Sequence, residues 1–475
     1  MKKLFLFLLI ALFTIQQIAV LPGCANIIPP TGGPMDSTPP RLVKADPPDS
    51  SKGFKDKTIT LTFDEYIQDV QQQNLLENLI ISPTPTIAPV IESKLKTITV
   101  KIKDTLEANT TYSYNFGKSI KDYNEGNVLE NFSYIFTTGT SLDSLELTGK
   151  VLLAETGGID STLIVMLHKS GDDSALIKDS PRYIAKLDGK GSFRFRILPA
   201  GIYYVYALKD DGGTRRYFPK TKLFAFADQP VEIKPGVTEI ILYAFAEKGE
   251  PPSATAPISI NRGAANRADE RRLKFTTTII NKQQDLLNPF TLSFEQSLKN
   301  FDTTKMMLST DSAYVPEKNY SWQPDSLNKK ITLIIKWKEN TNYNLILDKE
   351  FAEDTAGRKL LKTETLNFAT KKQTEYGTVR INFSNFDLTK NPVLLFLQSG
   401  QIVKSYTLTT ASFSQPLFFP GEYELRMLND ENKNGIWDPG DFFGKRKQPE
   451  LVKPIDKKIT IKANWDNEFE ITSPL

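Results

Sequence analysis

The feature that most constrains the fold is a pattern of alternating apolar and polar residues that occurs twice. Such alternation is typical of strands with one buried face. Each copy has an opening strand, a second alternating strand, an Asn-Thr-x-Tyr step and a closing strand, at residues 58–65, 98–103, 109–112 and 134–138, and again at 290–295, 331–336, 340–343 and 366–370. Phe63 and Tyr112 are 49 residues apart, as are Phe294 and Tyr343. The equal spacing predicts a duplicated β-sandwich module.

Family-like motifs flank these strands in the first copy. An entry stretch, Asp36-Ser37-Thr38-Pro39-Pro40-Arg41-Leu42, precedes a strand that ends in Phe63-Asp64, and the copy closes with a Phe-x-Thr step. These residues resemble the bacterial Ig-like domain over residues 36–140 and, in divergent form, over 273–371. The resemblance implies a sandwich in which Tyr112 either makes the tyrosine-corner hydrogen bond or fills the core edge.

A second module type occupies the remaining stretches. Residues 163–167 and 393–397 are wholly apolar and are expected to form strands. Later in each module, a glycine that follows a proline-containing turn begins another strand, and an acidic residue follows that strand. Gly201 and Asp210 are nine residues apart, as are Gly421 and Asp430. These stretches resemble the transthyretin-like or carboxypeptidase-regulatory-like sandwich, most clearly in DGKGSFRFRILPAGIYYVYALKD at 188–210.

The chain as a whole is therefore expected to be all-β, with tandem β-sandwiches of the Ig-like and transthyretin-like types, each used twice. Composition agrees, because 29 prolines disfavour long helices and the 11% of aromatic residues favours strands. The predicted order is a signal peptide (1–23), a lipid-anchored tether (24–35), an Ig-like sandwich (36–140), a transthyretin-like sandwich (146–247), a linker (248–272), a divergent Ig-like sandwich (273–371) and a transthyretin-like sandwich (376–475).

The N-terminus has the pattern of an export signal. Lys2 and Lys3 precede the apolar run 4–13, and Leu21-Pro22-Gly23-Cys24 follows. The last four residues resemble the lipobox of bacterial lipoproteins. The resemblance implies cleavage before Cys24 and its modification with fatty acyl chains such as palmitate, which anchor the chain to a membrane. Because Ala25 follows the cysteine, the resemblance favours the outer membrane, on its periplasmic or surface face.

The sharpest local motif is DENKNGIWDPGD at 430–441. Its spacing matches an EF-hand-type loop, in which side-chain oxygens and one backbone carbonyl surround calcium and glycine permits the turn. The predicted ligands are Asp430, Asn432, Asn434, Ile436 (through its carbonyl), Asp438 and Asp441. The alternative is a solvated Asx/Gly turn without metal. A bound calcium would be a structural brace, and otherwise no cofactor is expected.

Charge and rare residues limit the function. With 59 basic and 56 acidic residues, the chain lacks the basic excess of a nucleic-acid binder. The sequence has one cysteine and one histidine, His168. These are too few for an intrachain disulfide, a zinc hydrolase site or a catalytic Cys/His pair supported by further His or Cys residues. We therefore expect a non-catalytic cell-envelope lipoprotein that acts as a scaffold or binding arm for an unknown protein or glycan partner. The alternative is a carbohydrate-active enzyme or its accessory subunit, in which Trp322 or Trp437 could stack on sugar.

Overall fold

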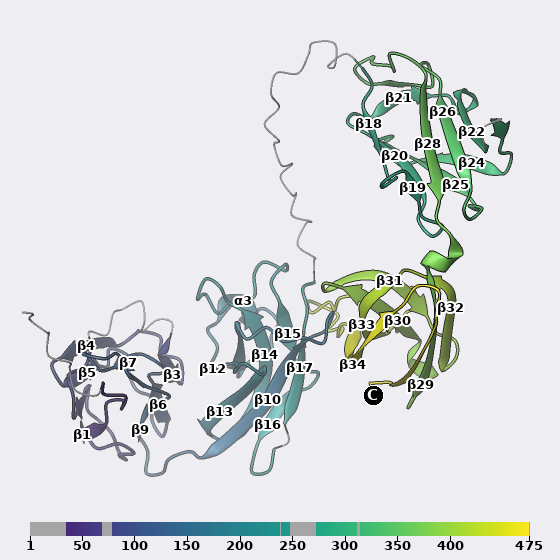
Figure 1. Ribbon diagram of the computed structural model, residues 1–475. Coiled ribbons are helices and arrows are strands. Elements are labelled where there is room, and N and C mark those ends of the chain that lie inside the picture. Colours follow the sequence, from purple (N-terminus) through teal and green to yellow (C-terminus); the bar gives the residue numbers. More distant parts are fainter. Residues whose placement is uncertain (1–34, 69–77, 238, 248–271, 311–313, 475) are drawn as a thin grey trace, which may run out of the picture. The chain divides into compact units, whose positions relative to one another are not determined.

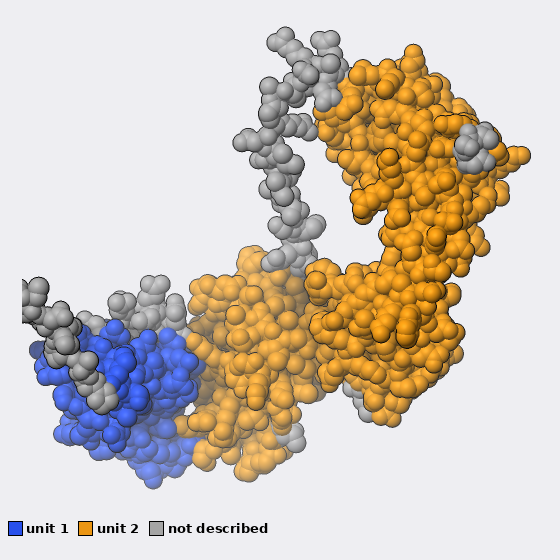
Figure 2. Space-filling view, in the orientation of Figure 1, with its two compact units in different colours: residues 1–143 blue, residues 144–475 orange. Residues whose placement is uncertain are grey.

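The computed structural model describes residues 35–68, 78–237, 239–247, 272–310 and 314–474 (Figure 1). The chain divides into two compact units, residues 1–143 and 144–475 (Figure 2). The predicted signal peptide, Cys24, the tether up to residue 34 and linker residues 248–271 lie outside the described residues. Within the described part, no helix is both long and apolar enough to span a lipid bilayer.

Unit 1 contains a β-sandwich that we call module 1. Its strands are β1 (Leu42–Asp46), β2 (Thr58–Phe63), β3 (Ile80–Ser82), β4 (Val90–Lys94), β5 (Thr97–Lys101), β6 (Thr111–Asn115), β7 (Ile120–Lys121), β8 (Val128–Leu129) and β9 (Ser133–Thr137). One sheet has the order β1-β2-β5-β4, another has β3-β6-β9, and β7 pairs with β8. Alternation places Ile59, Leu61 and Phe63 of β2 in the core, where Phe136 stacks on Phe54 at 3.9 Å.

Unit 2 contains a second sandwich of this kind, module 3. Its strands are β18 (Phe275–Thr277), β19 (Gln283–Gln284), β20 (Phe290–Phe294), β21 (Leu298–Phe301), β22 (Met306–Thr310), β23 (Val315–Pro316), β24 (Tyr320–Pro324), β25 (Lys330–Ile335), β26 (Asn342–Leu347), β27 (Ala352–Asp354) and β28 (Glu364–Thr370). The order β18-β20-β25-β24 repeats that of β1-β2-β5-β4, and β22-β26-β28 repeats β3-β6-β9. The equal spacing in the sequence therefore corresponds to equal strand order.

The tyrosine of the Asn-Thr-x-Tyr step makes the same hydrogen bond in both modules. The Tyr112 hydroxyl accepts from the backbone N–H of Glu107 at 2.8 Å, and the Tyr343 hydroxyl accepts from that of Lys338 at 3.4 Å. Each bond reaches five residues back along the chain, as in the tyrosine corner of β-sandwiches. Of the two roles considered for Tyr112, the structure shows both, because the residue makes the corner hydrogen bond and also packs in the core against Phe136 at 5.2 Å.

We expect Tyr112→Phe to destabilise module 1 by about 1 kcal/mol, the usual net value of one hydrogen bond. Tyr343→Phe is the matched variant, and its longer bond predicts a smaller loss in module 3. Urea denaturation of the full chain and both variants measures the two differences. Equal losses would show that bond length does not set the contribution.

Modules 2 and 4, both in unit 2, share a different strand order. Module 2 contains β10 (Leu145–Leu153), β11 (Leu163–His168), α3 (Ala175–Lys178), β12 (Tyr183–Lys186), β13 (Ser192–Leu198), β14 (Gly201–Lys209), β15 (Phe224–Phe226), β16 (Val231–Ile233) and β17 (Ile240–Ala244). Module 4 contains β29 (Gly377–Ser384), β30 (Pro392–Gln398), β31 (Gln401–Thr407), β32 (Ser412–Phe418), β33 (Gly421–Asn429), β34 (Leu451–Ile461) and β35 (Asp466–Thr472). The order β13-β10-β17 matches β32-β29-β35, and the outer pairs β10–β17 and β29–β35 are parallel.

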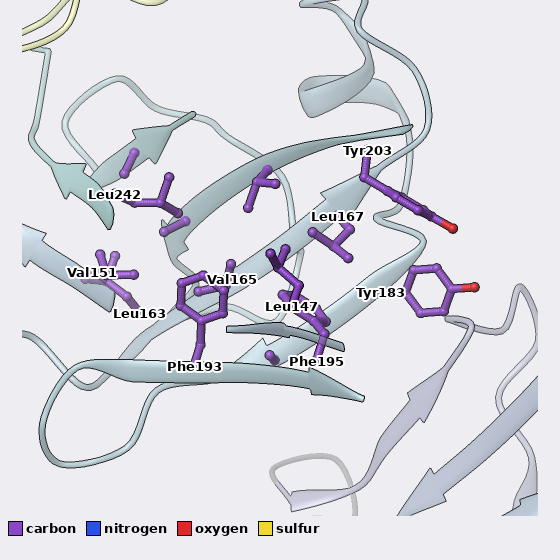
Figure 3. Close-up of a cluster of buried hydrophobic side chains, with 14 of the residues drawn as sticks. Leu147, Val151, Leu163, Val165, Leu167, Tyr183, Phe193, Phe195, Tyr203 and Leu242 are labelled. Atoms are coloured by element: carbon purple, nitrogen blue, oxygen red, sulfur yellow. The ribbon is translucent and has the colours of Figure 1, made fainter. Parts of the chain in front are cut away.

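Apolar side chains from both sheets of module 2 meet between them (Figure 3). Leu147 and Phe193 come from one sheet, and Val165 and Leu167 come from the other. Modules 1, 3 and 4 likewise enclose apolar clusters of their own. The predicted all-β fold of tandem sandwiches is confirmed, whereas the transthyretin-like resemblance of modules 2 and 4 stays a prediction.

Candidate functional site

The predicted calcium loop lies between β33 and β34 of module 4. Its first residue, Asp430, follows directly on β33 and is only 1% exposed. The Asp430 carboxylate accepts from the backbone N–H groups of Asn434 (3.2 Å) and Gly435 (2.7 Å). Gly435 has φ +79°, a conformation that glycine adopts without steric cost. The glycine thus lets the loop curl around the Asp430 carboxylate.

The structure brings three more of the predicted ligands together. The side-chain amides of Asn432 and Asn434 both donate to Oδ2 of Asp438. The amide oxygens of the same two residues accept from backbone N–H groups of the loop, Asn432 Oδ1 from Asn434 at 3.0 Å and Asn434 Oδ1 from Ile436 at 2.8 Å. Asp430, Asn432, Asn434 and Asp438 therefore form one oxygen-rich loop.

The two remaining predicted residues lie differently. The N–H of Ile436 donates to Oδ1 of Asn434 at 2.8 Å, and the Ile436 side chain is exposed. The carboxylate of Asp441 pairs with Lys445 at 3.2 Å, and its backbone exchanges hydrogen bonds with Lys447. Asp441 thus opens a separate hairpin, and its carboxylate pairs with a lysine of that hairpin.

Glu450 contributes a carboxylate that the sequence pattern does not reveal. Its side chain is 1% exposed, and it accepts from the backbone N–H groups of Glu431 (2.8 Å) and Asp438 (3.1 Å). Its carbonyl accepts from the indole N–H of Trp437 at 2.7 Å. Glu450 is twenty residues after Asp430, and the hairpin that begins at Asp441 lies between them. Glu450 is therefore outside any contiguous loop motif.

The loop holds negative charge away from water. Burial raises the pKa of the Glu450 carboxyl, and the charge of Asp430 raises it further, against the lowering effect of the N–H donors. Buried carboxylates close to one another are stabilised by a cation, and oxygen donors of this kind suit calcium. Among the described residues, no group of three or more His, Cys, Asp or Glu side chains is arranged to hold a metal ion. Any calcium would therefore depend on amide and backbone oxygens as well.

The corresponding loop of module 2 lacks these additional groups. The Asp210 carboxylate accepts from the N–H of Arg215 at 3.0 Å and from the hydroxyl of Thr214 at 3.3 Å. These contacts close an Asx-type turn of the kind that polar loops use without metal. The two loops therefore provide a matched comparison within one chain.

The other residues singled out from the sequence contribute to packing. His168 is 3% exposed and lies edge-on to Tyr206 at 5.7 Å, and burial lowers its pKa against the opposing charge of Asp179. Trp322 packs at right angles to Tyr320, and Trp437 packs against the apolar residues of module 4. Trp465, which the sequence analysis did not select, is 61% exposed, with the Lys462 ammonium 4.9 Å from its ring centre.

The chain is similar to several solved structures, all at low sequence identity. The major pilin subunit of Bacillus cereus is 9% identical, with 70% of this chain and 99% of the pilin covered and a TM-score of 0.16. The N-terminal part of the bacterial S-layer protein SbsC is 15% identical, with 43% of each chain covered and a TM-score of 0.16. A segment of native alpha-2-macroglobulin from Escherichia coli is 10% identical, with 42% of this chain and 93% of that segment covered and a TM-score of 0.20.

Sequence comparison is more specific for the first module. No curated protein matches the chain. Residues 36–138 match the family described as the bacterial Ig-like domain, which agrees with the expected span of 36–140. Module 1 is therefore similar to the bacterial Ig-like domain over nearly its whole length.

Proposed function

We propose that this protein is a non-catalytic cell-envelope lipoprotein whose β-sandwich modules form a scaffold or binding arm for protein or glycan. The observation that supports the proposal is the division of the chain into separately packed sandwiches. Each sandwich of the described chain buries an apolar cluster of its own, and the modules follow one another along the sequence. Exposed loops at the ends of such independently packed modules are available to a partner.

We expect the anchor to be the acylated Cys24, so that Cys24→Ser abolishes membrane attachment. Two or more acyl chains hold a protein stably at a bilayer, because each buried methylene contributes about 0.8 kcal/mol. The measurement is the distribution of the full-length protein between envelope and soluble fractions. Cys24→Ala is a second variant, which should behave in the same way. Retention of both variants in the outer membrane would contradict lipid anchoring.

The scaffold role is tested by affinity capture of the lipidated protein from envelope fractions, with the Cys24→Ser form as control. The expected result is a protein or glycan partner that co-purifies reproducibly with the anchored form. Release of soluble sugars from envelope polysaccharide by the purified chain would instead favour the alternative, a carbohydrate-active enzyme or its accessory subunit.

We further propose that the loop at 430–438 binds calcium as a brace, with Glu450 as an additional ligand. At 2 mM calcium, a site with a dissociation constant of about 10⁻⁴–10⁻³ M would stabilise module 4 by about 0.6–1.8 kcal/mol. Calorimetry should therefore record a rise of a few degrees in Tm. Asp430→Ala should abolish the calcium-dependent rise, whereas Asp210→Ala in the matched loop of module 2 should leave it intact. No shift at millimolar calcium would rule the brace out.

A further inference from the structure

We propose that modules 2 and 4 are locked into one rigid body by a docking hairpin, residues 441–447, whose partner surface is the outer face of the β11–β14–β15 sheet. The inference goes beyond the proposed scaffold function, because it assigns that face a specific occupant from the same chain. The hairpin lies between β33 and β34 of module 4, and Asp441 and Lys447 pair at its base.

The apolar part of the contact centres on Phe442, which is 0% exposed. Its ring centre lies 5.1 Å from those of Phe224 and Phe226 and 5.8 Å from that of Tyr206. Phe443 stacks on Tyr217 at 5.7 Å with the rings 7° from parallel. One apolar cluster thus includes residues of module 2 together with the hairpin of module 4.

Polar contacts surround this cluster and fix its orientation. The Arg446 guanidinium donates to Asp173 at 2.6 Å and to the carbonyl of Gly171 at 2.7 Å. The Gln448 side chain donates to Asp228 at 2.6 Å and to the carbonyl of Phe226 at 3.0 Å. Directed hydrogen bonds around an apolar centre are the arrangement of a specific interface.

Backbones also approach closely across the contact. The N–H of Val452 donates to the carbonyl of Ala154 at 2.8 Å. A Cβ at Gly440 would lie 2.5 Å from the Phe245 ring, and one at Gly157 would collide with Pro454. Only residues without side chains fit at these two positions, which indicates a contact packed as tightly as a core.

The lock explains why β11 is apolar on both faces. Val165 and Leu167 of β11 face the core of module 2, whereas Met166 belongs to the cluster that Phe442 completes. Leu176 and Tyr217 of module 2 belong to the same cluster, and Phe442 of the hairpin completes it. Modules 2 and 4 are thus expected to act as one body although module 3 lies between them in the sequence.

Spin labels on the two modules test the proposal in the full chain without its export signal and with Cys24→Ser. Lys150 of module 2 and Asp456 of module 4 are exposed positions for cysteine substitution. Pulsed dipolar spectroscopy should give one narrow distance distribution in this protein, and Phe442→Ala should broaden it several-fold. A broad distribution before the Phe442 substitution would overturn the proposal, as would an unchanged narrow one after it.

Phe413→Ala is the matched control, because Phe413 lies in the separate core of module 4, at 4.8 Å from Tyr406. It should lower the stability of module 4 but keep the distance distribution narrow under native conditions. Hydrogen exchange provides a second readout that does not depend on labels. Amide exchange at Phe224 and Phe245 should accelerate at least tenfold in Phe442→Ala and not in Phe413→Ala, and equal rates in the two variants would refute the lock.

Discussion

Replacing Phe396 by alanine is expected to destabilise module 4 by about 3–5 kcal/mol, the range for deleting a fully buried aromatic ring. Phe396 is 0% exposed at the centre of β30. Its ring contacts Phe418 at 4.7 Å, Phe413 at 5.6 Å and Tyr423 at 5.9 Å. The loss combines the transfer of the ring to water with the cavity left among these neighbours, which are themselves held by two sheets and cannot collapse inward.

Equilibrium denaturation in urea, followed by far-ultraviolet circular dichroism, measures this loss. Ile402→Ala in the same module is the control, because Ile402 is 54% exposed on β31 and should change stability by no more than about 0.5 kcal/mol. Similar losses in the two variants would show that Phe396 does not organise the core.

Replacing Asp122 by asparagine is expected to destabilise module 1 by about 2–3 kcal/mol at neutral pH, because hydrogen bonds to a charged acceptor are stronger than neutral ones. Asp122 is 1% exposed and accepts from the backbone N–H groups of Glu125 (2.7 Å), Gly126 (2.9 Å) and Asn127 (2.7 Å). An asparagine keeps the shape but loses one acceptor oxygen and the charge.

The same carboxylate predicts a pH dependence. Burial raises the pKa of Asp122, but the N–H donors of Gly126, Glu125 and Asn127 outweigh this and hold it below the ordinary value of 3.8. The stabilisation is therefore complete above pH 3.8 and is lost as pH falls through the folded-state pKa. Urea denaturation from pH 7 downward should show the difference from Asp122→Asn shrink in acid. A difference for Asp122→Asn that stays constant over this pH range would contradict the mechanism.

The repeated strands could be predicted from the sequence because their side chains alternate with the pleat of a sheet. The separation of 49 residues between Phe63 and Tyr112, and between Phe294 and Tyr343, persists because both pairs occupy equivalent strand positions. The apolar run 163–167 was predicted as a strand, and the structure buries residues on both of its faces. What covers its second face could not be inferred, because Phe442 is more than 270 residues away in the sequence.

The candidate loop shows the same limit at shorter range. Asp430, Asn432, Asn434 and Asp438 are brought together because they belong to one continuous turn. Glu450 joins them only because the hairpin returns the chain to the start of β34. A motif defined by spacing considers only residues of one continuous segment. It therefore selected Asp441, the twelfth residue of the loop motif, and did not find Glu450.

The parallel pairing of first and last strands in modules 2 and 4 has a mechanical consequence. In module 4, β29 pairs with β35 from Thr378–Asp466 to Ser384–Thr472, and in module 2, β10 pairs with β17 from Gly149–Ile240 to Leu153–Ala244. Tension between the two ends of such a module pulls the paired strands lengthwise past each other. The evenly spaced hydrogen bonds of a parallel ladder then share the force and must break together. Stretching would therefore meet shear resistance, which rises with the number of paired residues and is greater in module 4.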